Sequence, residues 1–373
     1  AQGPKDLALL LAVVASASMA ALCGVEQYDD ESEEDEDSED DGSDEEEEDA
    51  LPAAPEGFAF TASCYVNPKG VRLMTYRLKA RAQRCRGVIF LCHGYAVHTL
   101  HEWLLASKPG QAPHQTWEGS VFYSLAAAGY DVRALDHQGH GRSDGARGLR
   151  CFFETFDDLA EEATAYIKDK VLQDAEVAAL PLFVFGISMG GATAVRMVQM
   201  EPALYKGMVL YAPMLSLEEA KKVKVFACIY NRHLVPVSGC LSTLIPTFPI
   251  AKPARNEIHP LSQKEQDDDP LCYSGDVRAR VAENFLTVAT KFMDGDLASV
   301  KTPFVTFHGV NDTFTDPAGS QRLMELASVS DKTYLKVGPG CDVDVNIWHA
   351  MTTEPGCEIV FKRALAWIEE RTP

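Results

Sequence analysis

A serine, an aspartate and a histidine, far apart in the chain, occupy the places where nucleophilic catalysis would need them. Ser188 lies in the pattern Gly-Ile-Ser-Met-Gly at residues 186–190. A serine hydroxyl is a poor nucleophile at neutral pH, so it needs a base that accepts its proton and a carboxylate that orients this base. Where this pattern carries the nucleophile, the acid and then the histidine follow it along the chain. The two partners are therefore sought after Ser188.

The sequence around Ser188 predicts the local structure that a nucleophile requires. The apolar stretch 181–185 predicts a buried strand, and 188–200 has helical spacing, so the serine lies at a strand-to-helix turn. Such a turn strains the backbone and exposes the hydroxyl. Gly186 and Gly190 flank the serine because a Cβ at either position would collide with the neighbouring strand or helix. The alternative is a glycine-rich turn that contains an incidental serine.

Asp312 is the predicted acid. It follows the apolar strand 303–307, the next long strand after an irregular region, in the run His-Gly-Val-Asn-Asp. Asp316 is the alternative, four residues further on. Because it directly precedes a helix that opens with Pro317, Asp316 has a structural role as a helix N-cap. We therefore assign the acid to Asp312.

The predicted base is His349, which is chosen by its position. The chain contains 10 histidines, and most histidines in a protein are surface or core residues without a catalytic role. His349 lies between the last predicted strand, 332–337, and the last predicted helix, 355–370, which is where the base is expected.

Attack on a carbonyl creates a negative oxygen that fixed donors must stabilise. The backbone N–H of Met189, directly after the nucleophile, is one predicted donor. The other is the N–H of Tyr95, in the run His-Gly-Tyr that follows the strand 87–92. Gly94 allows the backbone to approach closely. We interpret His93 as a structural hydrogen-bonding residue, with a second base as the alternative.

A second glycine-rich segment, Asp-His-Gln-Gly-His-Gly-Arg-Ser-Asp-Gly, occupies residues 136–145. Its two histidines and two aspartates could bind a metal ion. The glycines indicate a tight loop braced by polar side chains, so we favour a structural loop beside the active site. We predict that the reaction needs neither a metal nor a cofactor.

Outside these motifs, short apolar strands alternate with helices. The expected strands are 58–66, 71–79, 87–92, 131–135, 181–185, 207–211, 303–307 and 332–337, and the expected helices are 117–128, 156–172, 188–200, 317–326 and 355–370. Such alternation predicts an α/β protein with a mostly parallel sheet covered by helices on both faces. The stretch at about 213–300 is far too long for a loop, so we expect an inserted, mainly helical cap within a hydrolase domain of residues 57–373.

Two segments precede this domain. Residues 7–24 are apolar but short for a membrane span, and Ser-Met-Ala at 18–20 fits a cleavage site, so we interpret residues 1–25 as a signal peptide or signal anchor, with a structural helix as the alternative. We interpret residues 26–56 as an acidic disordered linker. A signal or anchor would place the protein in the secretory pathway or at a membrane, and its absence would place the protein in the cytoplasm.

The formal net charge of −21 is concentrated in this linker. Of 55 Asp and Glu residues, seventeen lie between Asp29 and Asp49, which leaves 38 against 34 Lys and Arg residues. The rest of the chain is only mildly acidic and has no basic patch, which argues against nucleic-acid binding. The 10 cysteines have no metal-binding spacing, although Cys341 and Cys357 could pair in an oxidising compartment.

Several motifs appear in a fixed order: HGY, DHQGHGRSDG, GISMGG, YAPM, HGVNDTFTDP and WHA. Together they resemble the monoacylglycerol lipase and lysophospholipase-like α/β hydrolases, also labelled serine aminopeptidase-like hydrolases, and the plant-type members most of all. The resemblance covers roughly residues 58–371. It implies the α/β-hydrolase fold, a cap over the serine, and esters of long acyl chains as substrates. It implies the same site: Ser188, Asp312 and His349, with Tyr95 and Met189 as oxyanion donors.

This sequence departs from the family at two places. The stretch after HGY reads AVHTLHEW, so the residues that recognise glycerol cannot be carried over, and the loop GPGCDVDVNIWH before the base is longer. We predict a serine hydrolase that cleaves esters of acyl lipids, a monoacylglycerol or a lysophospholipid, through an acyl-enzyme. The alternatives are an acyltransferase, an aryl-ester esterase, a peptidase and a non-catalytic binding protein. Association with a membrane surface fits a lipid substrate, and the oligomeric state is not predicted.

Overall fold

The structure is a computed structural model that describes residues 51–222, 224–226, 229–230, 238–253 and 255–373. The predicted signal segment and the predicted linker up to residue 50 lie outside the described residues. The end of that linker contacts the folded domain, because the Trp117 indole N–H donates to the Ala53 carbonyl at 2.8 Å. Among the residues described, no helix combines the length and the hydrophobicity needed to cross a bilayer.

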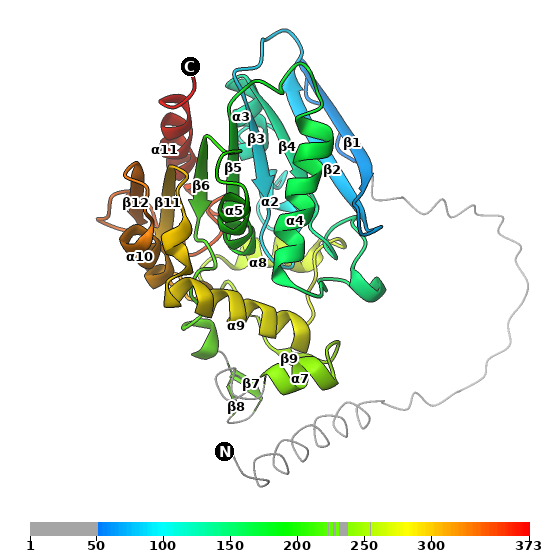
Figure 1. Ribbon diagram of the computed structural model, residues 1–373, viewed down its shortest axis with the longest axis vertical. Helices are drawn as coiled ribbons and strands as arrows, with labels where there is room; N and C mark the ends of the chain where they lie inside the picture. The colour runs from blue at the N-terminus through cyan, green and yellow to red at the C-terminus, as the bar shows by residue number, and fades with distance from the viewer. Residues whose placement is uncertain (1–50, 223, 227–228, 231–237, 254) are drawn as a thin grey trace, which may run out of the picture. The chain divides into compact units, whose positions relative to one another are not determined.

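An eight-stranded sheet forms the centre of the domain, in the order β1-β2-β4-β3-β5-β6-β11-β12 (Figure 1). Only β2 runs against its neighbours; from β4 to β12 every pairing is parallel. The strands are β1 (Phe58–Val66), β2 (Arg72–Ala80), β3 (Gly87–Cys92), β4 (Tyr130–Leu135), β5 (Leu182–Ile187), β6 (Gly207–Tyr211), β11 (Phe304–Gly309) and β12 (Lys332–Val337). This order and the predominance of parallel pairs confirm the predicted α/β-hydrolase fold.

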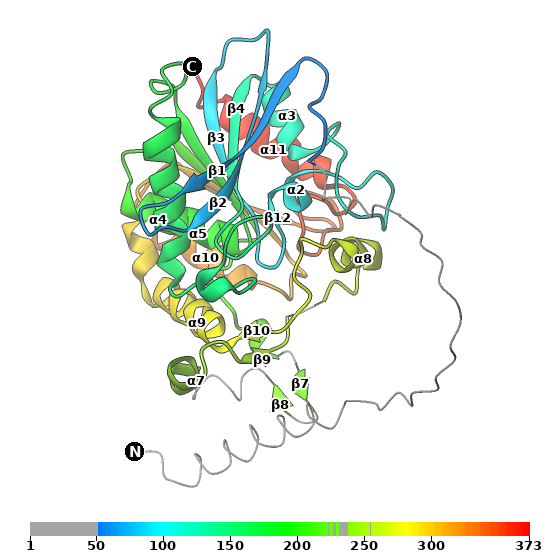
Figure 2. The same ribbon diagram turned by 90° about the vertical axis from the view of Figure 1, so that its right-hand side faces the viewer.

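Helices cover both faces of the sheet, as Figures 1 and 2 show. Alternate side chains of β3 point to opposite faces: Val88 and Phe90 join the core beneath α4 and α5, whereas Ile89 and Leu91 join the core beneath α3 and α11. The helices of this framework are α2 (Thr99–Trp103), α3 (Val121–Ala127), α4 (Phe156–Tyr166), α5 (Met189–Met200), α10 (Pro317–Leu326) and α11 (Cys357–Glu369). Burial on both faces explains why the central strands are continuously apolar.

Two predicted helices differ from the observed ones by more than two residues at one end. The helix predicted over 117–128 begins only at Val121, because the Ser120 hydroxyl caps it by accepting a hydrogen bond from the Tyr123 N–H. The helix predicted over 156–172 keeps α-helical bonding up to Tyr166 and continues as a π-helical turn over Ile167–Val171. Neither change alters the order of the elements.

The segment between β6 and β11 is the one expected to form the cap. It holds the helices α7 (Ser238–Leu244), α8 (Pro260–Asp268) and α9 (Ala279–Asp294), together with the short strands β7 (Lys224–Phe226), β8 (Ile229–Tyr230), β9 (Pro249–Ala251) and β10 (Val277–Arg278). In Figures 1 and 2, α7, α9 and the short strands lie together at one end of the central sheet. We call residues 213–300 the cap.

Cys341 and Cys357 are both free thiols in this structure, so the disulfide considered for them is not formed.

Candidate active site

Ser188 lies at the turn between β5 and α5 in a strained backbone conformation. Its φ and ψ are 54° and −121°, outside the regions that non-glycine residues favour. The Ser188 N–H donates to the Tyr211 carbonyl at 3.0 Å, and the Ser188 carbonyl accepts from the Met214 N–H at 2.9 Å. These bonds tie the turn to the end of β6 and to the first residues of the cap, so the strain is held by the surrounding structure.

The flanking glycines let three backbone segments meet at this turn. A Cβ at Gly186 would lie 2.2 Å from the Gly190 carbonyl oxygen, and a Cβ at Gly190 would lie 2.1 Å from the Cys92 carbonyl oxygen. Distances below about 3 Å are steric overlap, so neither position accepts a side chain. This is the collision with the neighbouring strand and helix that the sequence predicted.

His349 and Asp312 form a buried hydrogen-bonded pair. His349 Nδ1 donates to Asp312 Oδ2 at 2.7 Å. Asp312 is itself held in place: Oδ1 accepts from the backbone N–H groups of Phe314 and Thr315 at 2.8 and 3.0 Å, and Oδ2 accepts from the Thr315 hydroxyl at 3.0 Å. The carboxylate therefore has a fixed orientation that presents Oδ2 to the imidazole.

Asp316, the alternative acid, has the structural role that its position predicted. Its side chain accepts hydrogen bonds from the Ala318 N–H at 2.9 Å, as the N-cap of α10, and from the Ser216 hydroxyl at 3.0 Å. The structure therefore places Asp312, and not Asp316, against the imidazole of His349.

The charges in this pair favour an ionised aspartate and a basic histidine. Burial alone would raise the pKa of Asp312, but the charge of His349 and the hydrogen bonds from His308 and His349 outweigh it, so this pKa lies far below its usual value. Burial alone would lower the pKa of His349. The charge of Asp312 and its hydrogen bond, followed by the charges of Glu354 and Glu102, outweigh burial and raise that pKa.

The longer loop before the base does not displace it. After β12 the loop folds back on itself: the Gly338 N–H donates to the Val343 carbonyl at 3.0 Å, and the Val343 N–H donates to the Lys336 carbonyl at 3.1 Å. The additional residues are absorbed in this local pairing. His349 still meets Asp312.

The two residues predicted to be oxyanion donors are Met189, which directly follows Ser188, and Tyr95, which lines the same pockets as Ser188. Met189 is the first residue of α5, where N–H groups have no partner within the helix. Tyr95 follows β3 and, with Ser188, lines both pockets described below. The preceding Gly94 N–H donates to Glu102 Oε2 at 3.1 Å, and this contact fixes the loop that carries Tyr95.

His93 has the structural role that the sequence predicted. Its Nε2 accepts a hydrogen bond from the His137 N–H at 2.8 Å, so the proton of the ring lies on Nδ1, which is 2.7 Å from the Gly94 carbonyl oxygen. Burial lowers the pKa of His93 to about 4, so the ring stays neutral at physiological pH.

The glycine-rich segment 136–145 is a structural loop. Asp136 is fully buried and accepts hydrogen bonds from the N–H groups of Thr99 and Arg142 and from the Tyr76 hydroxyl, each at 2.9 Å. All three donors converge on one carboxylate, so Asp136 braces the loop from within.

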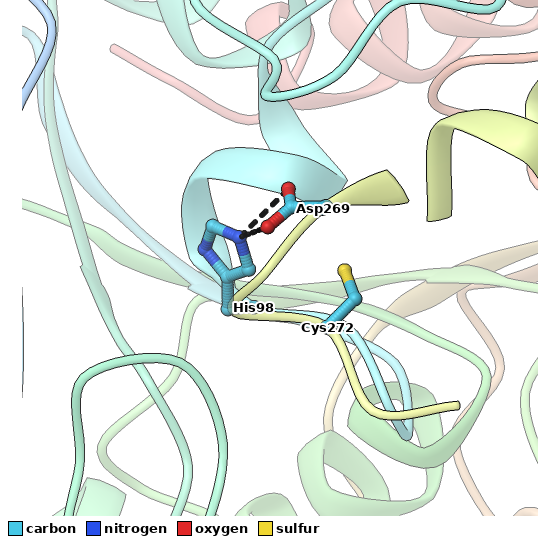
Figure 3. A group of neighbouring side chains, drawn as sticks. All are labelled: His98, Asp269 and Cys272. Atoms are coloured by element: carbon cyan, nitrogen blue, oxygen red, sulfur yellow. Dashed lines mark hydrogen bonds and ion pairs between the residues drawn. The ribbon is translucent and has the colours of Figure 1, made fainter. Parts of the chain in front are cut away.

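Within the described part of the chain, one group has the spacing of metal ligands: the ligand atoms of His98, Asp269 and Cys272 lie within 4.8 Å of one another (Figure 3). Asp269 Oδ2 lies 3.2 Å from His98 Nε2 and 3.1 Å from His101 Nδ1, and Oδ1 accepts from the Leu271 N–H at 2.9 Å. Hydrogen bonding accounts for these contacts. The group joins the cap to the loop after β3.

Two pockets meet at Ser188. One spans about 870 Å³, open solvent included, and is lined largely by apolar side chains, among them Met214, Leu217, Ile250, Val277, Phe285 and Leu286. The other spans about 930 Å³, open solvent included, and is also lined by His349. Polar side chains from the cap line the second pocket, among them Arg255, Asn256, Ser262, Gln263 and Gln266. We call the first of these the apolar pocket and the second the polar pocket.

Two buried carboxylates near His349 were not predicted from the sequence. Glu102 lies on α2 and accepts from the Thr352 hydroxyl at 2.5 Å; Glu354 lies in the loop before α11 and accepts from the His349 N–H at 3.2 Å. Neither belongs to a motif with a known spacing. Thr352 lies 250 residues after Glu102, and Glu354 also accepts from Asn256, 98 residues before it, so local sequence carries no signal for these two contacts.

The strand order, the strained serine after β5 and the histidine–aspartate pair after β11 and β12 define a hydrolase of the α/β-hydrolase fold. The chain belongs to the family described as Serine aminopeptidase, S33, whose profile matches residues 83–355. The resemblance inferred from the motifs is thereby confirmed.

Curated proteins similar to this chain are named as ester-cleaving enzymes. The chain is 29% identical over 325 residues to a caffeoylshikimate esterase of Arabidopsis thaliana, covering 85% of this chain and 87% of the relative. It is 28% identical to a monoacylglycerol lipase of Mycolicibacterium smegmatis, covering 76% and 88%.

Solved structures support the fold. A monoacylglycerol lipase of Paleococcus ferrophilus superposes with a TM-score of 0.60 at 21% identity, covering 80% of this chain and 99% of that one. A soluble variant of monoglyceride lipase from Saccharomyces cerevisiae, in complex with a substrate analog, superposes with a TM-score of 0.62 at 18% identity, covering 84% and 96%.

Proposed function

We propose that this protein hydrolyses carboxylic esters through an acyl-enzyme formed on Ser188. His349 accepts the proton of the Ser188 hydroxyl during attack and returns it to the departing alcohol, and Asp312 holds the imidazole. Water then releases the acid. The N–H groups of Tyr95 and Met189 stabilise the negative oxygen. The observation that carries the proposal is the 2.7 Å contact of His349 and Asp312, with His349 and Ser188 lining one pocket.

The two pockets support an acyl lipid as the substrate. The apolar pocket offers a water-poor surface to an acyl chain, and the polar pocket offers hydrogen-bonding groups to an alcohol. Because both pockets include Ser188, an ester bond at the serine would place its two halves in different surroundings. A monoacylglycerol or a lysophospholipid has this division between an apolar acyl chain and a polar alcohol.

An ester of an aromatic acid is the second candidate. The plant relative is named for such a substrate, and it shares 29% identity across 85% of this chain. An aromatic acyl group is rigid and shorter than a fatty acyl chain, so it would fill less of the apolar pocket.

A substrate panel on the full chain separates these candidates. We expect kcat/KM for an oleoyl monoacylglycerol or oleoyl lysophosphatidylcholine to exceed that for a hydroxycinnamoyl ester. Leu286→Trp should narrow the apolar pocket and reduce kcat/KM for the oleoyl ester by at least about tenfold, while an acetyl ester changes little. Liberated acid is measured with and without added glycerol as an acyl acceptor.

The matched control is Leu244→Trp, at a cap position that is 76% exposed, which should leave both rates unchanged. Preference for the hydroxycinnamoyl ester would favour the second candidate. Formation of a new ester with glycerol in place of free acid would establish acyl transfer. The absence of turnover of every ester would contradict the proposal.

Activity should be lost on the acidic side of neutrality. His349 must be neutral to accept the serine proton, and its pKa is raised above the ordinary value of 6.5. Protonation therefore removes the base as the pH falls through this raised pKa, and the acid limb of log kcat/KM should have its midpoint above pH 6.5. A pH profile between 5 and 9 measures it; a midpoint below 6 would contradict the assigned environment of His349.

A further inference from the structure

The side chain of Glu354 is fully buried, and four N–H groups donate hydrogen bonds to it. Oε2 accepts from the Trp348 N–H at 2.6 Å, and Oε1 accepts from the N–H groups of His349 and Ala350 at 3.2 and 3.0 Å. Three successive N–H groups of the loop that carries the proposed base thus point to one carboxylate.

Two further contacts of Glu354 come from the cap. The Asn256 side-chain amide donates to Oε1 at 2.9 Å, and His259 Nε2 lies 3.3 Å from Oε2. Asn256 is itself fixed, because its Oδ1 accepts from the His259 N–H and its own N–H donates to Gln263, both at 2.8 Å. The segment before α8 therefore reaches the loop of His349 through a single carboxylate.

The chemistry of this arrangement requires a carboxylate. The four groups that hydrogen-bond to it are all donors, so a carboxylate, which only accepts hydrogen bonds, satisfies these four. A glutamine side chain has the same shape, but its NH₂ group would face N–H donors at one of the two oxygen positions. A buried NH₂ group that faces other N–H groups leaves donors without acceptors, which costs free energy. The loop of His349 or the cap segment would shift to reduce this cost.

We propose that Glu354 is a positioning residue that fixes the backbone of His349 and couples its orientation to the placement of the cap over the site. The proposal rests on the proposed function, since it assigns His349 the role of base. Asn256 and His349 line the same polar pocket, so the bridge spans the site at which an alcohol would leave. Movement of the segment that carries Asn256 would then change the orientation of His349.

Several charged or titratable groups face His349. Asp312 lies on one side, with His308 at 3.4 Å from its carboxylate; Glu102 approaches from α2 and Glu354 from the loop before α11. The negative charges of Asp312, Glu354 and Glu102 raise the pKa of His349. Removal of the Glu354 charge should therefore lower the pKa of the base, an effect that a purely structural residue would not have.

The test compares Glu354→Gln with Glu358→Gln, the same substitution at an exposed position on α11. For Glu354→Gln we expect kcat to fall about 10- to 100-fold, because a displaced base loses its alignment with the hydroxyl. KM should change less than about threefold if substrate contacts persist. The acid limb of the pH profile should move to lower pH. Glu358→Gln should match the unmodified protein in kcat, in KM and in the midpoint of the acid limb.

Fluorophosphonate labelling of Ser188 distinguishes a failure of the proposed function from a failure of the role proposed for Glu354. If the unmodified protein is not labelled, the proposed function itself fails. If it is labelled and Glu354→Gln reacts at the same rate with an unshifted acid limb, only the role of Glu354 is overturned. A lower kcat with an unshifted limb would also overturn it, because the loss would then be structural.

Asn256→Ala keeps the proposal testable if Glu354→Gln does not fold, which thermal unfolding would reveal. It removes the cap donor but leaves the three backbone donors in place. We expect kcat for the oleoyl ester to fall about 3- to 10-fold, because one hydrogen bond that supports the loop of His349 is lost. Unchanged kcat in a folded Asn256→Ala protein would overturn the coupling of the cap to the base.

Discussion

Replacing Ser188 with alanine is expected to lower kcat for the preferred ester by about 10⁴- to 10⁶-fold, because the nucleophile is removed and only binding and oxyanion stabilisation remain. Fluorophosphonate labelling should disappear with it. The fold should survive, since alanine keeps the Cβ of serine and the 54° φ is imposed by the surrounding bonds and not by the hydroxyl. Kinetics on the full chain, with thermal unfolding, measure both effects.

Ser299→Ala is the control for this prediction. Ser299 is exposed, and its hydroxyl donates to the Asp296 carbonyl at 2.8 Å, at the end of the cap and away from both pockets. Its activity and labelling should equal those of the unmodified protein. Retention of more than about 1% of kcat in a folded Ser188→Ala protein would show that another group attacks the ester.

The framework of the fold could be predicted because it follows from local patterns. The continuously apolar strand 87–92 was predicted with the bounds that the structure gives it, and so was the helix 317–326 that begins at Pro317. Strand ends, glycines and the order of the elements then determined where side chains of distant segments meet. For this reason Asp312 and His349, 37 residues apart, could be paired from sequence position alone.

The features that could not be predicted depend on contacts between distant segments. No sequence pattern links the residues that make these contacts. The partners of Glu354 include Asn256, 98 residues earlier, and the partners of Asp269 include His98, 171 residues earlier. Both contacts join the cap to the framework. The π-helical turn at Ile167–Val171 was also missed, because its side chains follow the apolar spacing of an ordinary helix.

The choice between Asp312 and Asp316 shows how local chemistry can decide a catalytic assignment. Both aspartates follow β11, and both carboxylates accept a backbone N–H two residues further on: Phe314 for Asp312 and Ala318 for Asp316. The difference is the second oxygen. In Asp312 it faces His349, whereas in Asp316 it faces the Ser216 hydroxyl. The proline after Asp316 was the sequence signal for this difference.

Asp312→Asn is expected to lower kcat by about 10⁴-fold at neutral pH, by changing which nitrogen of His349 carries the proton. The N–H groups of Phe314 and Thr315 donate to Oδ1, so asparagine must place its carbonyl oxygen there. Its NH₂ group then replaces Oδ2 and faces His349 Nδ1 as a donor. The imidazole must accept at Nδ1 and carry its proton on Nε2, so it cannot take the proton of Ser188.

Asp316→Asn is the matched control, because asparagine serves as a helix N-cap about as well as aspartate. We expect its kcat to stay within about threefold of the unmodified protein and its thermal unfolding to be nearly unchanged. Each variant replaces one carboxylate oxygen with an NH₂ group, and the two positions are four residues apart. If Asp316→Asn lost activity and Asp312→Asn kept it, the acid would have been assigned to the wrong aspartate, since only a carboxylate that orients the base is sensitive to this exchange.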